Sequence, residues 1–294
     1  MKRRRALIGI IIVIIIGFFV LRTVQREPVG KMISKIAFQK GKIGIVEIKG
    51  IIMDSEYAIR DINQFKEDDS IQAIVVRIDS PGGAVGPSQE VYEELAKLSN
   101  EKIVVASMGS VGASGAYYIA CGAQKIVANP GTITGSIGVI MEYVEIKDLL
   151  KWAKVEPVVI KSGEFKDAGS PFREMKESER RYLQSLINNV HSQFIRAVSD
   201  GRKLPLTEVK ALADGRIFSG EIAKELGLVD ELGNFQDAID LAANLANIEG
   251  KPELMYPMRK KFRVFEKFVD NLNRLLVGRE QVLRGLTLNY ILHY

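Results

Sequence analysis

The sequence contains very little cysteine and histidine, and both shortages limit the chemistry that it can carry. Cys121 is the only cysteine among 294 residues, so the chain can form neither an intrachain disulfide nor a cysteine metal cluster. We expect Cys121 to be a small buried hydrophobic residue. Histidine occurs twice, as His191 and His293. A histidine-based catalytic site therefore has two candidates, and the second lies at the end of the chain.

The middle of the chain lacks a net positive charge, although the net charge of the whole chain is +5. Residues 2–5 carry a charge of +4, and residues 251–294 contain nine Lys or Arg against four Asp or Glu. The remainder of the chain therefore carries a net charge of −4. A nucleic-acid-binding surface places positive charge on the folded domain itself, so this distribution argues against a nucleic-acid partner.

One long apolar run is present, and it lies at the N-terminus. Four basic residues at 2–5 precede an apolar run over residues 6–21, and Arg22 and Arg26 follow it. The run is short for a bilayer span, but helix tilt and snorkelling side chains compensate. A cleaved signal peptide, the alternative, would place small residues where residues 18–23 are large. We expect an uncleaved signal anchor within residues 1–27, with its N-terminus in the cytoplasm and the remainder of the chain outside the cell membrane.

The central part of the chain alternates between expected strands and helices, which predicts an α/β fold with a parallel or mixed sheet. Apolar runs predict strands at residues 43–48, 71–78, 103–108, 125–128, 139–143 and 157–160. Amphipathic or small-residue segments predict helices at residues 55–68, 87–99, 116–123, 147–153, 177–199, 207–213, 220–226 and 235–246. In such sheets, active groups lie at the carboxyl ends of the strands.

The two ends of the chain differ from this core. Residues 28–41 read as a connector from the membrane, residues 42–250 as the folded domain and residues 251–294 as a basic tail. The tail contains apolar residues at helical spacing between Lys and Arg: Phe262, Phe265, Val269, Leu272 and Leu276. Such an amphipathic helix suits an anionic lipid surface. The alternative is that it packs on its own domain or on a neighbouring subunit.

The turn after the strand expected at 103–108 carries a candidate nucleophile, Ser114. Small residues surround it, and a sharp strand-to-helix turn needs such neighbours because bulk would clash with the backbone. A serine there lies at a helix N-terminus, where free backbone N–H groups can stabilise an oxyanion. The alternative is that Ser114 is only a helix N-cap.

A serine nucleophile needs a base, and two residue types are available for that role. His191 is expected on the surface of a long helix and His293 in the tail, so a histidine-based site is poorly supported. A lysine can act as the base where burial keeps its amine neutral. Lys161 and Lys166 stand out because both lie in a Gly/Ser loop after an expected strand. Either one, taken alone, also fits a solvated loop lysine.

Several motifs, in this order, resemble the signal peptide peptidase A family of the Clp protease–crotonase superfamily. They are Asp-Ser-Pro-Gly-Gly (79–83), Gly-Ala-Ser-Gly-Ala-Tyr-Tyr (112–118), Gly-Ser-Ile-Gly (135–138), Ser-Gly-Glu-Phe-Lys-Asp-Ala (162–168), Ala-Asp-Gly-Arg-Ile-Phe-Ser-Gly (213–220) and Leu-Gly-Leu-Val-Asp-Glu-Leu-Gly (226–233). The similarity covers about residues 42–245 and is closest to the short, single-domain form. It implies a Clp protease/crotonase-like α/β fold with repeated ββα units, preceded by one transmembrane helix.

The resemblance also implies roles for five residues. Ser114 matches the nucleophile and Lys166 the general base. The backbone N–H groups of Gly83 and Gly115 match the oxyanion hole, and Ser136 matches a serine that orients the lysine. One departure is Ala116, where members of the family often have a second glycine.

Taken together, the resemblance implies a membrane-anchored serine endopeptidase that degrades signal-peptide remnants at the membrane without a metal or organic cofactor. Its substrates are hydrophobic peptides, and the family forms homo-oligomers in which Lys166 can reach Ser114 of an adjacent subunit. Three alternatives remain: a serine hydrolase or esterase that uses His191, a crotonase-type acyl-CoA enzyme, and a non-catalytic membrane scaffold.

Overall fold

The computed structural model describes residues 41–258 and 289–291, the last three by their backbone alone. The predicted membrane anchor at 1–27, residues 28–40 of the connector and the predicted amphipathic helix of the tail lie outside the described residues. Within the described ranges, no helix is both long enough and apolar enough to cross a bilayer.

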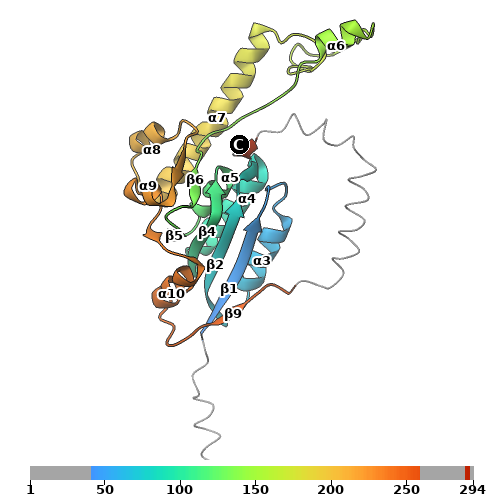
Figure 1. Ribbon diagram of the computed structural model, residues 1–294. Helices are drawn as coiled ribbons and strands as arrows, with labels where there is room; N and C mark the ends of the chain where they lie inside the picture. The colour runs from blue at the N-terminus through green and yellow to red at the C-terminus, as the bar shows by residue number, and fades with distance from the viewer. Residues whose placement is uncertain (1–40, 259–288, 292–294) are drawn as a thin grey trace, which may run out of the picture. The chain divides into compact units, whose positions relative to one another are not determined.

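A mostly parallel sheet forms the centre of the described domain (Figure 1). Its strands are β1 (Lys42–Lys49), β2 (Ile71–Ser80), β4 (Ile103–Ala113), β5 (Lys125–Ala128), β6 (Ile133–Gly135), β7 (Ile217–Ser219), β8 (Glu231–Leu232) and β9 (Glu253–Met255). The order is β7-β6-β4-β2-β1-β9, and β5 pairs with both β4 and β8. The β6–β7 pair is antiparallel, whereas the other pairs of this sheet are parallel.

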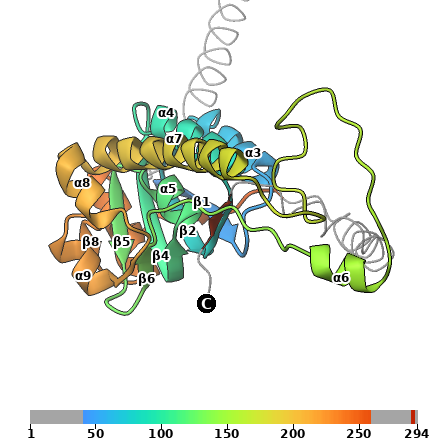
Figure 2. The same ribbon diagram turned by 90° about the horizontal axis from the view of Figure 1, so that it is seen from above.

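Helices cover both faces of this sheet (Figure 2). They are α3 (Glu56–Lys66), α4 (Val85–Leu98), α5 (Gly115–Ala120), α7 (Glu177–Arg202), α8 (Leu206–Leu212), α9 (Gly220–Glu225) and α10 (Phe235–Leu245). Helix α6 (Lys147–Trp152) lies away from the sheet (Figure 2) and has no buried residue. Successive side chains of a strand point to opposite faces, so β1 contributes to two hydrophobic cores. Ile43 and Ile45 pack in the core that contains α10. Val46 and Ile48 belong to the core on the other face, which contains residues of α3, α4, α5 and α7.

The predicted α/β core is confirmed, and the parallel-rich sheet is consistent with a Clp protease-like fold. The structure has β5 at the predicted bounds, and β4 continues beyond its prediction to Ala113, directly before Ser114. Two predicted strands are wrong, because residues 139–143 and 157–160 form no strand. Val158 and Ile160 are almost fully exposed, and no neighbouring strand pairs with their segment. An apolar run alone does not show which surface will cover it.

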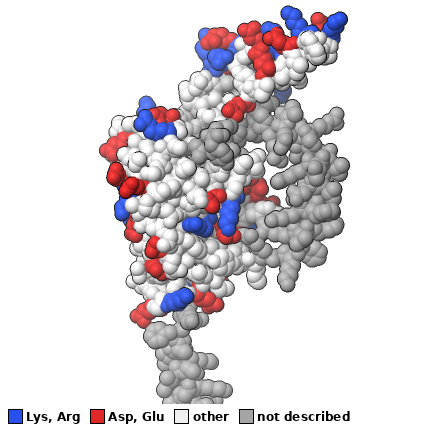
Figure 3. All heavy atoms as spheres, viewed as in Figure 1, with Lys and Arg blue, Asp and Glu red and all other residues white. Residues whose placement is uncertain are grey.

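Residues 141–176 form an arm that leaves the sheet after β6 and returns at the start of α7 (Figures 1 and 2). Every residue of the arm is described, and only Gly169 is buried. Charged side chains of both signs gather at its far end (Figure 3). Large apolar side chains are exposed along it: Val144, Leu149, Trp152, Val155, Val158, Val159, Ile160, Phe165 and Phe172. The arm therefore has no hydrophobic core of its own.

A short strand, β3 (Gly82–Ala84), follows β2 and has a neighbour on each side. On one side, the N–H of Ile52 donates to Gly82 (2.9 Å) and the N–H of Ala84 donates to Ile52 (2.7 Å). On the other side, β10 (Asn289–Ile291) pairs with β3 in antiparallel register. Successive residues of a strand direct their backbone N–H and C=O groups to opposite sides. Since Gly82 and Ala84 bond to Ile52, the N–H and C=O of Gly83 point toward β10.

Candidate active site

Ser114 lies at the junction of β4 and α5 in a strained backbone conformation. Its φ of 53° and ψ of −122° fall in a region that a residue with a Cβ rarely adopts. Such conformations cost about 1–3 kcal/mol and persist where the surroundings hold them. Here the N–H of Ser114 donates to Gly135 and its C=O accepts from Tyr118, both at 2.8 Å. The side chain makes no helix-capping hydrogen bond, so Ser114 is not a conventional N-cap.

Ser136 lies next to Ser114 because their two strands are in register. Ala113 of β4 pairs with Gly135 of β6, so the residues that follow leave adjacent strands at the same edge of the sheet. Ser136 also has a positive φ, of 50°, and its N–H donates to the C=O of Arg216 at 2.8 Å. Both serines are buried. The structure therefore brings together two of the predicted site residues.

Both serines line a cavity of about 440 Å³ at this edge of the sheet. Helix α7 closes one side with residues that share a helix face. The lining residues are Ser114, Ser136, Gly138, Val139, Ile140, Gln184, Ile187, Asn188, His191, Ala213, Asp214 and Gly215. The cavity thus combines two hydroxyl groups, aliphatic side chains and several polar groups, a mixture that is common in ligand-binding pockets.

His191 differs from its prediction as a plain helix-surface residue, because it lines this cavity. Its Nε2 atom is buried and has no hydrogen-bond partner among the described residues. His191 therefore makes no hydrogen bond to Ser114 in this conformation. No sequence signal marked this position, because Gln184, Asn188 and His191 form the kind of polar face that an ordinary amphipathic surface helix has.

Of the two candidate oxyanion-hole residues, one begins α5 and the other lies on a strand that packs against this helix. Gly115 is the first residue of α5 and follows Ser114 directly. Gly83 lies on β3, which packs against α5, but it is not among the residues that line the cavity. The C-terminal parts of β2 and β4 are joined by a side chain, since Oδ1 of Asp79 accepts the N–H groups of Ser110 and Val111 at 3.1 Å.

The structure distinguishes the two candidate lysines, both of which lie in the arm. The Lys161 amine donates to the C=O of Glu164 at 2.7 Å and forms an ion pair with Asp167. Lys166 is exposed, and its amine has no hydrogen bond or ion pair with any described residue. Lys166 does not line the cavity that contains Ser114. One protomer therefore carries the two groups on different parts of the domain.

Tyr117 and Cys121, in and directly after α5, are not competing nucleophiles. Burial raises the pKa of Cys121 to about 12, so its thiol stays protonated at neutral pH. Burial likewise raises the pKa of Tyr117 well above its usual value, and its hydroxyl donates to the C=O of Leu228 at 2.9 Å. The prediction that Cys121 is a small buried hydrophobic residue is confirmed.

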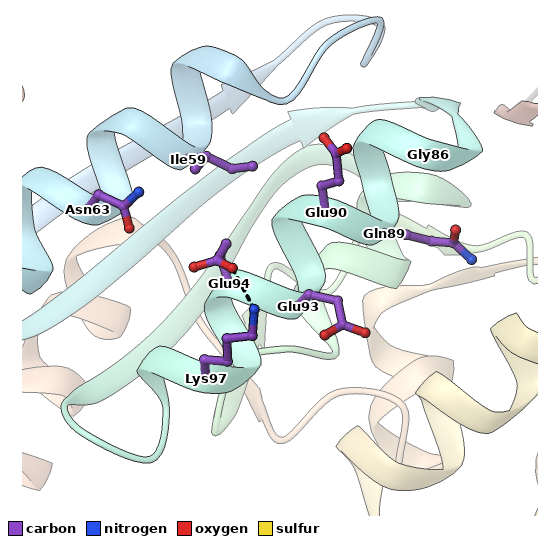
Figure 4. A pocket seen from close by; sticks show the side chains of 8 residues that line it. All are labelled: Ile59, Asn63, Gly86, Gln89, Glu90, Glu93, Glu94 and Lys97. Atoms are coloured by element: carbon purple, nitrogen blue, oxygen red, sulfur yellow. Dashed lines mark hydrogen bonds and ion pairs between the residues drawn. The ribbon is translucent and has the colours of Figure 1, made fainter.

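A second, larger groove of about 570 Å³ lies between α3 and α4 (Figure 4). Its side chains are mostly carboxylates and amides, and Lys97 pairs with Glu94 at 2.7 Å. The lining residues are Ile59, Asn63, Gly86, Gln89, Glu90, Glu93, Glu94 and Lys97. None of them is a serine, threonine or cysteine nucleophile, so the smaller cavity is the candidate active site.

A buried serine in a strained turn, at the carboxyl edge of a parallel-rich sheet, defines a serine hydrolase on an α/β fold. The Clp protease family profile matches residues 42–134. The profile described as Peptidase family S49 matches residues 96–249, which is more than half of the chain. The protein therefore belongs to peptidase family S49 and is a serine peptidase.

Relatives from distant organisms share this region. A Synechocystis sp. protein, provisionally named a protease, is 46% identical over 209 residues, which cover 71% of this chain and 76% of its own. An Enterococcus faecium protein, provisionally named signal peptide peptidase SppA, is 36% identical over 62% of this chain and 53% of its own. Protease 4 of Haemophilus influenzae is 32% identical over 70% of this chain, but that region is 35% of its own length.

Proposed function

We propose that this serine peptidase is a membrane-anchored endopeptidase that uses a Ser114/Lys166 dyad to degrade signal-peptide remnants. The observation that carries the proposal is the state of Ser114. Its backbone is held in a strained turn, its side chain is not used as a cap and it lines a cavity. The name of the Enterococcus faecium relative supports the substrate class.

In the proposed mechanism, the neutral Lys166 amine takes the proton of the Ser114 hydroxyl while the serine oxygen attacks the peptide carbonyl carbon. The N–H groups of Gly83 and Gly115 stabilise the resulting oxyanion. Lys166 then protonates the leaving amine, and an acyl-enzyme remains on Ser114. Water, deprotonated by Lys166, hydrolyses this ester and restores the serine. The hydroxyl of Ser136 orients the lysine amine.

Two features support a dyad formed between subunits. Lys166 lies on the exposed arm, away from the cavity that contains Ser114. The arm exposes aliphatic and aromatic side chains without a core of its own, and exposed apolar surface of this kind marks an interface. A second copy of the chain would cover the arm and receive its lysine. The proposed active form is therefore a homo-oligomer.

Mixing inactive variants tests this arrangement. Ser114→Ala and Lys166→Ala proteins are each expected to be inactive. When the two are unfolded together and assembled as a mixture, some interfaces combine an intact serine with an intact lysine, so part of the peptidase activity should return. A mixture that stays inactive, although size-exclusion chromatography shows mixed oligomers, would contradict the dyad between subunits.

The β3 edge supports a peptide substrate. Residues 289–291 already pair with β3 as an antiparallel strand, so this edge accepts an extended segment beside Gly83. A peptide bound in the same way would place its carbonyl groups near the Gly83 N–H. Val139, Ile140 and Ile187 line the cavity beside Ser114, so hydrophobic peptides should be cleaved with higher kcat/KM than polar peptides of equal length. Equal rates for both would contradict the proposed substrate class.

A serine peptidase that uses His191 is the second candidate, because His191 lines the Ser114 cavity with an unpartnered Nε2. The two candidates differ in which single substitution stops turnover. The Ser/Lys proposal expects Lys166→Ala to abolish peptide hydrolysis and His191→Ala to leave most of it. The reverse result would favour the histidine mechanism.

A further inference from the structure

The loop that carries Lys166 is attached to α7 through both of its neighbouring residues. Before it, the ring of Phe165 lies 5.1 Å from the ring of Tyr182 on α7, centroid to centroid. After it, Asp167 takes part in a cluster of ion pairs. Within the loop, the N–H of Lys166 donates to the C=O of Gly163 at 3.2 Å. The backbone is therefore held on both sides of a lysine whose amine is unengaged.

Arg173 is the centre of that cluster and uses all five of its N–H donors. Its Nε donates to the Asp167 carboxylate at 2.9 Å, and one Nη2 hydrogen donates to the Asp167 C=O at 3.0 Å. Two more bonds, at 2.9 and 2.5 Å, form a fork on the Glu179 carboxylate. The fifth donates to the C=O of Glu174 at 3.1 Å. A lysine has three donors at one point and cannot reproduce this pattern.

Glu179 anchors the cluster to the first turn of α7. Its side chain is 0% exposed and also accepts the N–H of Lys176 at 3.0 Å. The hydrogen bonds from Arg173 are the main cause that lowers the pKa of Glu179, to about 2, so the carboxylate is charged at neutral pH. A buried charge of this kind requires its partner. The position of Arg173 is thus fixed by the helix.

The cluster also balances the charge beside Lys166. Asp167 is the next residue, and an unpaired carboxylate there would favour the charged ammonium, which is not a base. Both Lys161 and Arg173 bind this carboxylate. Together with Asp167 and Glu179, these two residues form a cluster of two positive and two negative charges, so the Asp167 carboxylate is neutralised within the cluster.

We propose that Arg173 is a positioning residue for the peptidase reaction, because it joins Asp167 to Glu179 and so fixes and electrostatically shields the loop that presents Lys166. This inference rests on the proposed role of Lys166 as the base. Arg173 itself touches neither substrate nor Ser114; it acts through the lysine.

The test compares Arg173→Lys with Arg181→Lys in the full chain. Arg181 is an exposed residue of α7, the helix to which Arg173 binds through Glu179, and it serves as the control with a 4.0 Å ion pair to Glu177. In Arg173→Lys, kcat should fall by about 100-fold, because misplacing a catalytic group by about 1 Å has that effect, while KM stays unchanged. The acidic limb of the pH–rate profile should move to higher pH. The reason is that the Asp167 carboxylate loses part of its pairing and then favours the charged ammonium form of Lys166, which is not a base. Arg181→Lys should match the wild type in kcat, in KM and in the position of the acidic limb.

A second pair of variants covers the case in which Arg173→Lys does not fold. Glu179→Gln keeps the shape of the side chain but loses the charge, and Glu177→Gln is its exposed control in the same turn. Glu179→Gln should reproduce the loss of kcat and the shift of the limb. Because Arg173 and Glu179 act as one unit, the double variant should lose little more than either single variant.

Two results would overturn the inference. The first is that Arg173→Lys or Glu179→Gln keeps the wild-type kcat and the wild-type acidic limb of the pH–rate profile. The second is that the loss of kcat is accompanied by a lower unfolding temperature while the acidic limb stays in place, which would indicate a purely structural role. Lys166→Ala separates the inference from the function on which it rests. If Lys166→Ala keeps wild-type turnover, the dyad and the inference both fail; if it is inactive while Arg173→Lys behaves as Arg181→Lys, only the inference fails.

Discussion

Replacing Gly83 with alanine tests the proposed oxyanion hole most directly. A Cβ atom at this position would lie 2.0 Å from the carbonyl oxygen of Ile52 and 2.6 Å from the Ile52 nitrogen. Real Cβ atoms essentially never come closer than 3.0 Å to such atoms. The neighbour is backbone rather than a flexible side chain, so the two segments must separate by about 1 Å.

That separation affects both stability and catalysis. The hydrogen bonds that join Ile52 to Gly82 and Ala84, at 2.9 and 2.7 Å, would weaken, and each contributes about 1 kcal/mol. An oxyanion donor works at about 2.7–3.1 Å, so a displacement of about 1 Å removes the contact with the Gly83 N–H. Loss of one such donor costs about 100- to 1000-fold in kcat.

The assay measures kcat with a fluorogenic peptide, together with thermal unfolding of the same preparation. Gly86→Ala is the matched control, because Gly86 lies three residues further on in α4 and a Cβ there meets nothing within 4 Å. Alanine is also the better helix former, so Gly86→Ala should be at least as stable as the wild type and fully active. A folded Gly83→Ala protein with the kcat of Gly86→Ala would refute the role of Gly83.

Three further predictions follow from described contacts. Because β10 occupies the β3 edge, removing residues 289–294 should lower KM for peptides on the order of tenfold, as loss of a tethered competitor would; an unchanged KM in steady-state kinetics would argue against competition. The pKa of Glu179 is lowered to about 2 by its bonds to Arg173, so its contribution to stability is present above its unfolded value and is lost as the pH falls from about 4.5 toward 2; Glu179→Gln should flatten the unfolding temperature over that range, and Glu177→Gln should not. Cys121, buried and with a pKa of about 12, should react with a thiol reagent only in denaturant, and rapid native labelling would show that α5 opens.

The central strands were predictable because they are buried on both faces. Each of β1, β2, β4 and β5 contains a short apolar run beside a few polar or charged positions, and the shortness of these runs distinguishes the strands from amphipathic helices. The short strands β3 and β6 carry no such signal. Each has three residues, rich in glycine, and is ordered by its neighbours rather than by its own side chains. Their positions depend on tertiary pairing, which local patterns do not encode.

The arm marks another limit of sequence patterns. Residues 157–160 have the composition of a buried strand, yet they are exposed in the described chain. If a second copy of the chain covers the arm, as proposed, the apolar residues at 157–160 are buried between subunits and not within one subunit. Composition alone cannot separate these two kinds of burial.

The candidate site was predictable in part. The small residues around Ser114 indicated a tight turn, and the structure has one there. The residue pattern alone left Lys161 and Lys166 as equal candidates, and the family resemblance favoured Lys166. The structure adds that the Lys161 amine is engaged by Glu164 and Asp167. The position of His191 was missed because a polar residue on a long helix is usually solvated, and only α7 packing over the cavity shows otherwise.

The strained turn at Ser114 sets activity against stability at a single position. Glycine adopts a φ of 53° with a ψ of −122° at little cost, whereas serine and alanine do not. Ser114→Gly should therefore be a dead enzyme that unfolds at a higher temperature than the active one, by a margin equivalent to about 1 kcal/mol or more. Selection for stability alone would favour glycine at position 114, so the presence of serine there indicates selection for function.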